Sequence, residues 1–213
     1  MKILNILGID PSFNALACSL LVEDESTIYI DNASYSLGEK IGFEKVYTAC
    51  QDLLDQFLVK LRNFGVGSKF EIDKVLSEIP PPVSQFSAGL FALDTFILSN
   101  IWREFPSISE IYVVPSSYLS TVHETKNYDK GDSTRLAKYF MNEVLQDDFK
   151  VVIPENITPT GRHMKGTLNN DRAESYLFLL HMIAKYDIKG LRNKIVEEMQ
   201  GLGRDAERLL CSR

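Results

Sequence analysis

The sequence predicts an α/β protein with a mixed five-stranded sheet, in which three antiparallel strands precede a β-α alternation, flanked by helices. Short apolar runs with brief polar connections fill the first 36 residues, which is typical of strands. A long stretch then carries apolar residues at three- and four-residue steps and predicts a helix at 43–64. Strand-like and helix-like segments alternate after it, as in sheets that are covered by helices.

The first three strands are expected at 3–9, 15–22 and 27–36. The first two are almost wholly apolar, so we expect them to be buried. The third alternates apolar and polar residues and is expected to be half-exposed. Their short connections predict an antiparallel meander.

The later elements are bounded by glycine and proline. Gly65 and Gly67 end the first helix, and Pro80 prevents the next strand from continuing. The expected order is a strand at 72–79, a helix at 87–104, a strand at 109–114, a helix at 132–145, a weak strand at 151–153, a polar loop at 154–169, a helix at 170–186 and a charged helical tail at 188–210. We therefore expect one domain over 1–187 and a helical tail over 188–213.

Composition narrows the classes of protein and partner. No apolar run approaches the ~20 residues that span a bilayer, and the start lacks a signal-peptide layout, so we expect a cytoplasmic protein without membrane contact. Three scattered cysteines and three scattered histidines argue against a disulfide framework or a zinc site. The net charge is −6, but it is −7 over residues 1–110 and +1 over 111–213. Local basic patches would therefore have to attract any nucleic acid.

Four carboxylates stand at positions that suggest a site. Asp10 and Glu78 each end a predicted strand, while Asp171 and Glu174 lie three residues apart and share one face of a predicted helix. Four converging carboxylates would repel one another without cations, and oxygen ligands suit Mg²⁺ or Mn²⁺. A pair of such ions can clamp the attacking and leaving oxygens of a phosphodiester.

Each acid also has a simpler explanation. Asp10 begins an Asp-Pro-Ser turn, and Glu78 before a proline run is commonly just solvated. Asp171 suits a helix N-terminus, and Glu174 suits a capping box. Only the ordered set of four favours a metal site.

Three motifs resemble the RuvC-type Holliday-junction resolvases of the RNase H-like (retroviral-integrase-like) superfamily. These motifs are "ILGIDPSFNALACSLL", "KVLSEIPPP" and "NNDRAESYLFLL". The resemblance covers roughly residues 1–187 and implies an RNase H-like nuclease domain with metal ligands Asp10, Glu78, Asp171 and Glu174. It also implies a Mg²⁺-dependent endodeoxyribonuclease, with Mn²⁺ as a substitute, that nicks four-way or other branched DNA as a homodimer by hydrolysis.

The chain departs from the family pattern at several positions. Ser12 stands where the family commonly has Gly, and Glu174 where Asp is usual. The aromatic residue that stacks at the junction centre has no exact match, and Phe86 is the candidate for that role. These departures fit a divergent, phage-borne member that works in the host cytoplasm on a broader set of branched DNA.

Two segments are candidates for DNA contact. Residues 123–138 interleave basic residues with Tyr128 before a helix start, and residues 158–171 carry basic residues just before Asp171. The candidate contacts are Lys126, Lys130, Arg135, Lys138, Arg162 and Lys165. Solvated loops would explain both segments equally well.

Other functions stay open at this point. An actin-like or sugar-kinase ATPase also opens with a strand, an Asp and a turn, but the sequence lacks its second phosphate motif. A ribonuclease H acting on RNA–DNA hybrids shares the metal chemistry. A protein that binds branched DNA without cutting it is the non-enzymatic alternative, and the presence of all four acids weighs against it.

Overall fold

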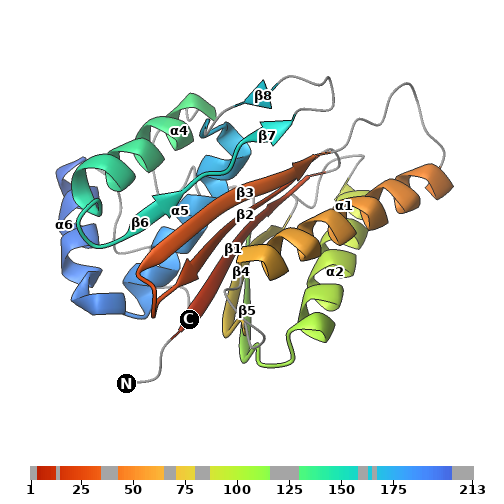
Figure 1. Ribbon diagram of the computed structural model, residues 1–213, viewed down its shortest axis with the longest axis horizontal. Helices are drawn as coiled ribbons and strands as arrows, with labels where there is room; N and C mark the ends of the chain where they lie inside the picture. Colours follow the sequence, from red (N-terminus) through yellow and green to blue (C-terminus); the bar gives the residue numbers. More distant parts are fainter. Residues whose placement is uncertain are drawn as a thin grey trace.

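The computed structural model describes residues 4–12, 15–34, 43–64, 71–79, 87–115, 130–157, 163–164 and 167–202. Within them, six strands form one sheet in the order β5-β4-β1-β2-β3-β6 (Figure 1). The strands are β1 (Asn5–Pro11), β2 (Ala15–Val22), β3 (Thr27–Ser34), β4 (Lys74–Ile79), β5 (Glu110–Pro115) and β6 (Lys150–Val152).

The direction of the strands matches the predicted meander and β-α alternation. β2 is antiparallel to both β1 and β3, whereas β4 is parallel to β1 and β5 is parallel to β4. This is the RNase H-like arrangement, which confirms the predicted fold class. The short β6 adds a sixth strand, parallel to β3 at Thr27 to Tyr29.

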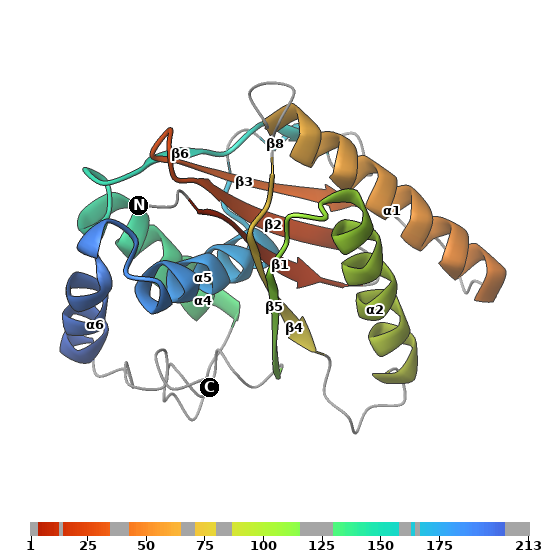
Figure 2. The same ribbon diagram turned by 90° about the horizontal axis from the view of Figure 1, so that it is seen from below.

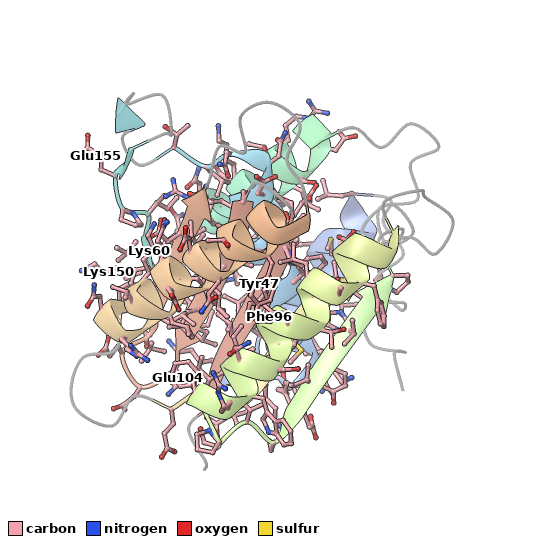
Figure 3. All side chains as sticks on the ribbon, turned by 90° about the vertical axis from the view of Figure 1, so that its right-hand side faces the viewer. Tyr47, Lys60, Phe96, Glu104, Lys150 and Glu155 are labelled. Atoms are coloured by element: carbon pink, nitrogen blue, oxygen red, sulfur yellow. The ribbon has the colours of Figure 1, made fainter. Side chains whose placement is uncertain are left out.

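Helices cover both faces of the sheet (Figures 1 and 2). One face carries α1 (Phe43–Phe64) and α2 (Ser87–Glu104). The other carries α4 (Lys130–Tyr139), α5 (Asn170–Lys185) and α6 (Arg192–Gly201). On the first face, Tyr47 of α1 and Phe96 of α2 lie against each other, with ring centroids 5.5 Å apart (Figure 3).

Two apolar clusters, one on each face, form the core. The alternation of side chains along β1 divides its residues between them, with Ile6 on the α5 face and Leu7 and Ile9 on the α1–α2 face. α5 is buried along almost its whole length, from Arg172 to Ala184. It is thus the central helix of its layer.

Several predicted elements need correction. The third strand is almost wholly buried, not half-exposed, because α1 and α5 cover its two faces. The helix expected at 132–145 ends at Tyr139 and continues as a π-helical turn, η1 (Phe140–Val144). The polar loop contains the two-stranded pair β7 (Asn156–Ile157) and β8 (His163–Met164).

The C-terminal segment contributes to the core. A 3-10 turn, η2 (Ile188–Gly190), precedes α6, whose Ile195 and Met199 are buried in the α5-side cluster. A domain boundary at residue 187 stays a prediction. Among the described residues, no helix has the length and hydropathy to cross a membrane.

Asp94 of α2 is an anomaly in this core. Its side chain is only 4% exposed, and neither carboxylate oxygen has a hydrogen-bond partner in the described part of the chain. Burial raises the pKa of this carboxyl from 3.8 to about 7. Ionised Asp94 therefore destabilises the folded state.

The substitution Asp94→Asn tests this cost. Because the pKa is raised in the folded state, the wild type loses stability as the pH rises from about 4 to about 7, and the loss is complete above that range. We expect the variant to melt on the order of 5 °C above wild type at pH 8 and much closer to it at pH 4. Thermal melts across this range measure the difference. The same substitution at the exposed Asp52 of α1 should leave the melting curve unchanged, and a gain at Asp94 that did not depend on pH would contradict the explanation.

Candidate functional site

Two of the predicted acids stand side by side on the sheet. Ile9 of β1 pairs with Ser77 of β4, so Asp10 and Glu78 occupy the next register position of two parallel strands. Neighbouring strands lie about 4.8 Å apart, and residues in register project to the same face. That face is the one under α5, because Gly8, two residues before Asp10, contacts this helix.

α5 runs antiparallel to β1, which brings its first turn to the end of the strand that carries Asp10. At its C-terminal end, Tyr186 donates to Glu110, which lies level with Ile6 through β4. At its N-terminal end, Arg172 bonds to Asp31, which lies level with Ile9 through β2. The two ends of the helix therefore match opposite ends of β1.

The level of α5 over the sheet is fixed at Gly8 and Ser19. A Cβ on Gly8 would lie 2.4 Å from the backbone oxygen of Ser175, and the hydroxyls of Ser19 and Ser175 are hydrogen-bonded at 2.8 Å. From Ser175 back to Asp171 the helix rises about 6 Å. From Gly8 forward to Asp10 the strand advances about 6.6 Å. The turn of α5 that bears Asp171 therefore lies over the end of β1.

The first turn of α5 is well defined. Asn169 caps it, accepting from the backbone N–H of Arg172 at 2.9 Å. Glu174 is thus five residues beyond the cap, which excludes the capping-box explanation for this acid. Its carboxylate instead accepts from the hydroxyl of the buried Ser133 on α4, at 3.1 Å. Asp171 lies in the first turn, where the helix dipole also favours an acid.

The turn after Asp10 is closed by Ser12. Its backbone N–H and its hydroxyl both donate to the backbone oxygen of Ala15, and its hydroxyl accepts from the Ala15 N–H. Asp10 itself stands within the strand, paired with Ala17, and is 8% exposed. Ser12 therefore has a role in closing this hairpin.

The predicted metal centre is not formed in this arrangement of side chains. Across the described residues, which include all four acids, no group of three or more His, Cys, Asp and Glu side chains is placed to hold a metal ion. The donor set nevertheless fits Mg²⁺ or Mn²⁺ in kind, since it consists of carboxylate oxygens on adjacent strand ends and an overlying helix turn. The four-acid site stays a prediction.

The candidate DNA contacts divide into two groups. Arg135, which pairs with Asp132, and Lys138 have exposed side chains on α4, and Lys130 begins that helix. Lys126, Arg162, Lys165 and Phe86 lie outside the described residues. The middle of α4 packs on the first turn of α5, where Thr134 donates to Asn170 at 2.8 Å. The basic helix is thus attached next to the acids.

Sequence reasoning missed the polar groups that support the site. Arg172 is fully buried and bonded to Asp31, which also pairs with Lys60 of α1. The sequence offers little sign of this role, because Arg172 lies in the polar first turn of α5, between Asp171 and Glu174, where a solvated side chain is the ordinary expectation. Nothing in the sequence indicates that Asp31 is buried, because the alternation of apolar and polar residues in its strand placed it among the residues expected to face solvent.

Neither the family models nor the curated proteins give a match to this sequence. Among solved structures, the chain is similar to T. thermophilus RuvC in complex with a Holliday junction substrate. The two share 12% sequence identity over 88% of this chain and 96% of the RuvC chain, with a TM-score of 0.48. This likeness concerns the fold alone.

The close approach at Gly8 can be tested by Gly8→Ala. The added methyl group would meet the backbone of α5, which cannot move as a side chain can, so we expect a loss of about 1–3 kcal/mol. Thermal or urea unfolding measures it. Gly201→Ala is the control, because nothing lies within 4 Å of its Cβ position. Equal stability of the Gly8 variant and wild type would refute the tight packing of α5 on β1.

Proposed function

We propose that the chain is a divalent-metal-dependent endodeoxyribonuclease that nicks four-way junctions or other branched DNA by hydrolysis. The observation that carries the proposal is the register of Asp10 beside Glu78, under the turn of α5 that bears Asp171. Asp10, Glu78 and Asp171 are far apart in the sequence, and each comes from one of the three motifs that resemble the resolvases. The fold brings the strand ends and the helix turn that carry them to one end of the sheet.

In this proposal, Asp10, Glu78, Asp171 and Glu174 hold Mg²⁺, or Mn²⁺ in its place. When bound, such ions supply Lewis-acid stabilisation of the charge that develops on phosphodiester oxygens. Asp10 and Glu78 contribute from rigid strands, whereas Asp171 and Glu174 contribute from a capped helix turn. Because carboxylates repel one another without a cation, their side chains must draw together as an ion binds.

The protein's own residues also suggest how DNA is held. The N-terminal turn of α5 bears two of the acids, and helix N-termini attract phosphate. α4 packs against this turn through Thr134. Arg135 and Lys138 are exposed on α4. We propose that they contact the DNA backbone together with Lys130, Lys126, Arg162 and Lys165, and that Phe86 stacks on bases.

We further propose that two copies of the chain pair through α2. Phe91 and Trp102 are 56% and 59% exposed, and their spacing of eleven residues places them on one line of the helix. Large exposed apolar side chains on one line favour a protein interface. A homodimer would present two sites to a symmetric junction.

The substitution Asp10→Asn tests the metal site. We expect at least a 10³-fold loss of nicking of a four-way junction with Mg²⁺, while binding to the junction stays within about threefold, because an amide is a poor ligand but keeps the shape of the strand. Nicking and gel-shift assays measure the two effects. Asp24→Asn, on the exposed β2–β3 turn, is the matched control. Undiminished cutting by the Asp10 variant would rule out the assigned site, and cutting of RNA–DNA hybrids in preference to junctions would favour a ribonuclease H.

The role of α4 can be tested by Arg135→Ala. We expect the variant to bind the junction more weakly. We also expect its affinity to depend less steeply on salt concentration, by about the amount that one phosphate contact contributes. Titrations at several salt concentrations measure both. Arg62→Ala is a matched control, since Arg62 is also an exposed arginine paired with an acid, but lies on the opposite face of the sheet. If both variants bind like wild type, α4 does not contact DNA.

The α2 interface can be tested by Trp102→Glu. We expect the variant to sediment as a monomer where the wild type sediments as a dimer, because a charge in an apolar interface costs several kcal/mol. Analytical ultracentrifugation measures this. Val59→Glu is the control, since Val59 is also an exposed apolar residue, but on α1. A dimer that survives Trp102→Glu would exclude this face.

A further inference from the structure

Arg172 is the largest fully buried side chain among the described residues, with 1% of its surface exposed. Its guanidinium donates to the carboxylate of Asp31 at 2.9 Å, to the backbone oxygen of Thr167 at 2.9 Å and to that of Pro154 at 3.3 Å. The side chain thus joins α5 to three other segments. It stands between the two helix acids in the sequence.

The bond to Asp31 passes around the edge of the sheet. β6 pairs with β3 only as far as Tyr29, so none of the described strands pairs with this edge of β3 at Asp31, and the Arg172 side chain reaches it there. Asp31 also forms an ion pair with Lys60 at 3.1 Å, and Lys60 lies on α1, on the opposite face (Figure 3). The row Arg172–Asp31–Lys60 therefore connects the helix layers on the two faces.

The geometry of the helix relates this anchor to the acids. Successive residues are rotated by about 100°. Ser175 faces the sheet at Ser19, and Arg172 lies about 60° to one side of it, toward β3. Asp171 and Glu174 lie about 40° and 100° to the other side. This is the side of β4, which carries Glu78.

We propose that Arg172 is a positioning residue that sets the rotation of the first turn of α5 about its axis. With the guanidinium held at β3, Asp171 and Glu174 are directed toward Asp10 and Glu78. This inference rests on the proposed role of the four acids as metal ligands.

Stability alone does not explain a buried arginine at this position. Desolvation offsets most of the attraction in a buried ion pair, so apolar residues of similar size often stabilise a protein equally well. The planar guanidinium can bond several acceptors in fixed directions at once, which a lysine cannot. A role in orientation therefore accounts for arginine better than a role in folding.

The test compares Arg172→Lys and Arg172→Met with wild type, using Mn²⁺ alone as the probe and no DNA. Binding of Mn²⁺ is followed by electron paramagnetic resonance, and folding by thermal melts. We expect both variants to bind Mn²⁺ at least tenfold more weakly, with Arg172→Lys still folded because it keeps a charge beside Asp31. A parallel nicking assay should show a matching rise in the Mg²⁺ concentration needed for half-maximal cutting.

Arg192→Met is the matched control. Arg192 also donates to two backbone oxygens, those of Ala184 at 3.0 Å and Lys185 at 2.7 Å, but at the other end of α5. We expect its Mn²⁺ affinity to stay within twofold of wild type. An equal loss in this variant would show that any damage to α5 weakens the site, and would overturn the specific role of Arg172.

The remaining outcomes also decide the matter. Wild-type Mn²⁺ affinity in a folded Arg172→Lys protein would overturn the proposal, and so would its failure to fold, which would make Arg172 a residue of the fold as a whole. Different results would show that the proposed function itself is wrong. In that case the wild type would bind no Mn²⁺, or the Asp10→Asn variant would bind Mn²⁺ as tightly as the wild type. If Mn²⁺ binds at the acids but no nucleic acid is cut, the Mn²⁺ affinities of the wild type and the Arg172 variants still decide whether Arg172 positions the acids.

Discussion

The packing of α5 directly on β1 is the constraint on which the site depends. At Gly8 the helix backbone comes so close that no side chain fits between the two elements, and the Ser19–Ser175 hydrogen bond fixes their relative level. Close packing of this kind leaves the helix little freedom to shift along the strand. The level of Asp171 over the end of β1 follows from this alignment.

The two faces of the sheet have different characters. The α1–α2 face is built mainly from apolar side chains and carries exposed aromatic residues on both helices, Tyr47 on α1 and Phe91 and Trp102 on α2. The α5 face combines an apolar cluster with polar groups concentrated at one end, where two strands finish, α5 begins and α4 packs on its first turn. Buried polar groups need partners, and here they are supplied by α4, β3 and the segment before α5.

Sequence patterns predicted the elements of this fold well because each strand and helix has a local signature. The helices at 43–64 and 87–104 have the expected bounds. The strand-end positions of Asp10 and Glu78 were likewise visible, and their register follows from two parallel neighbours.

The features that the sequence did not predict depend on contacts between residues far apart in the chain. The burial of β3 comes from helices on both faces, and the pairing of the predicted weak strand, β6, with β3 as a sixth strand joins residues far apart in the chain. The partners of Arg172 lie 5, 18 and 141 residues away, so no local pattern reveals them. The hydroxyl of Ser133 next to Glu174 likewise depends on how α4 packs on α5.

The hydrogen bond between Ser19 and Ser175 spans 156 residues of the chain. A ribosome must therefore complete most of the polypeptide before the first turn of α5 can pack over Asp10 of β1 and Glu78 of β4. Long-range pairings of this kind form late and slowly, because a large loop must close before they give any stabilisation. Nascent or C-terminally truncated chains would carry Asp10 and Glu78 without the first turn of α5, so this turn and the two strand ends would come together only late in synthesis.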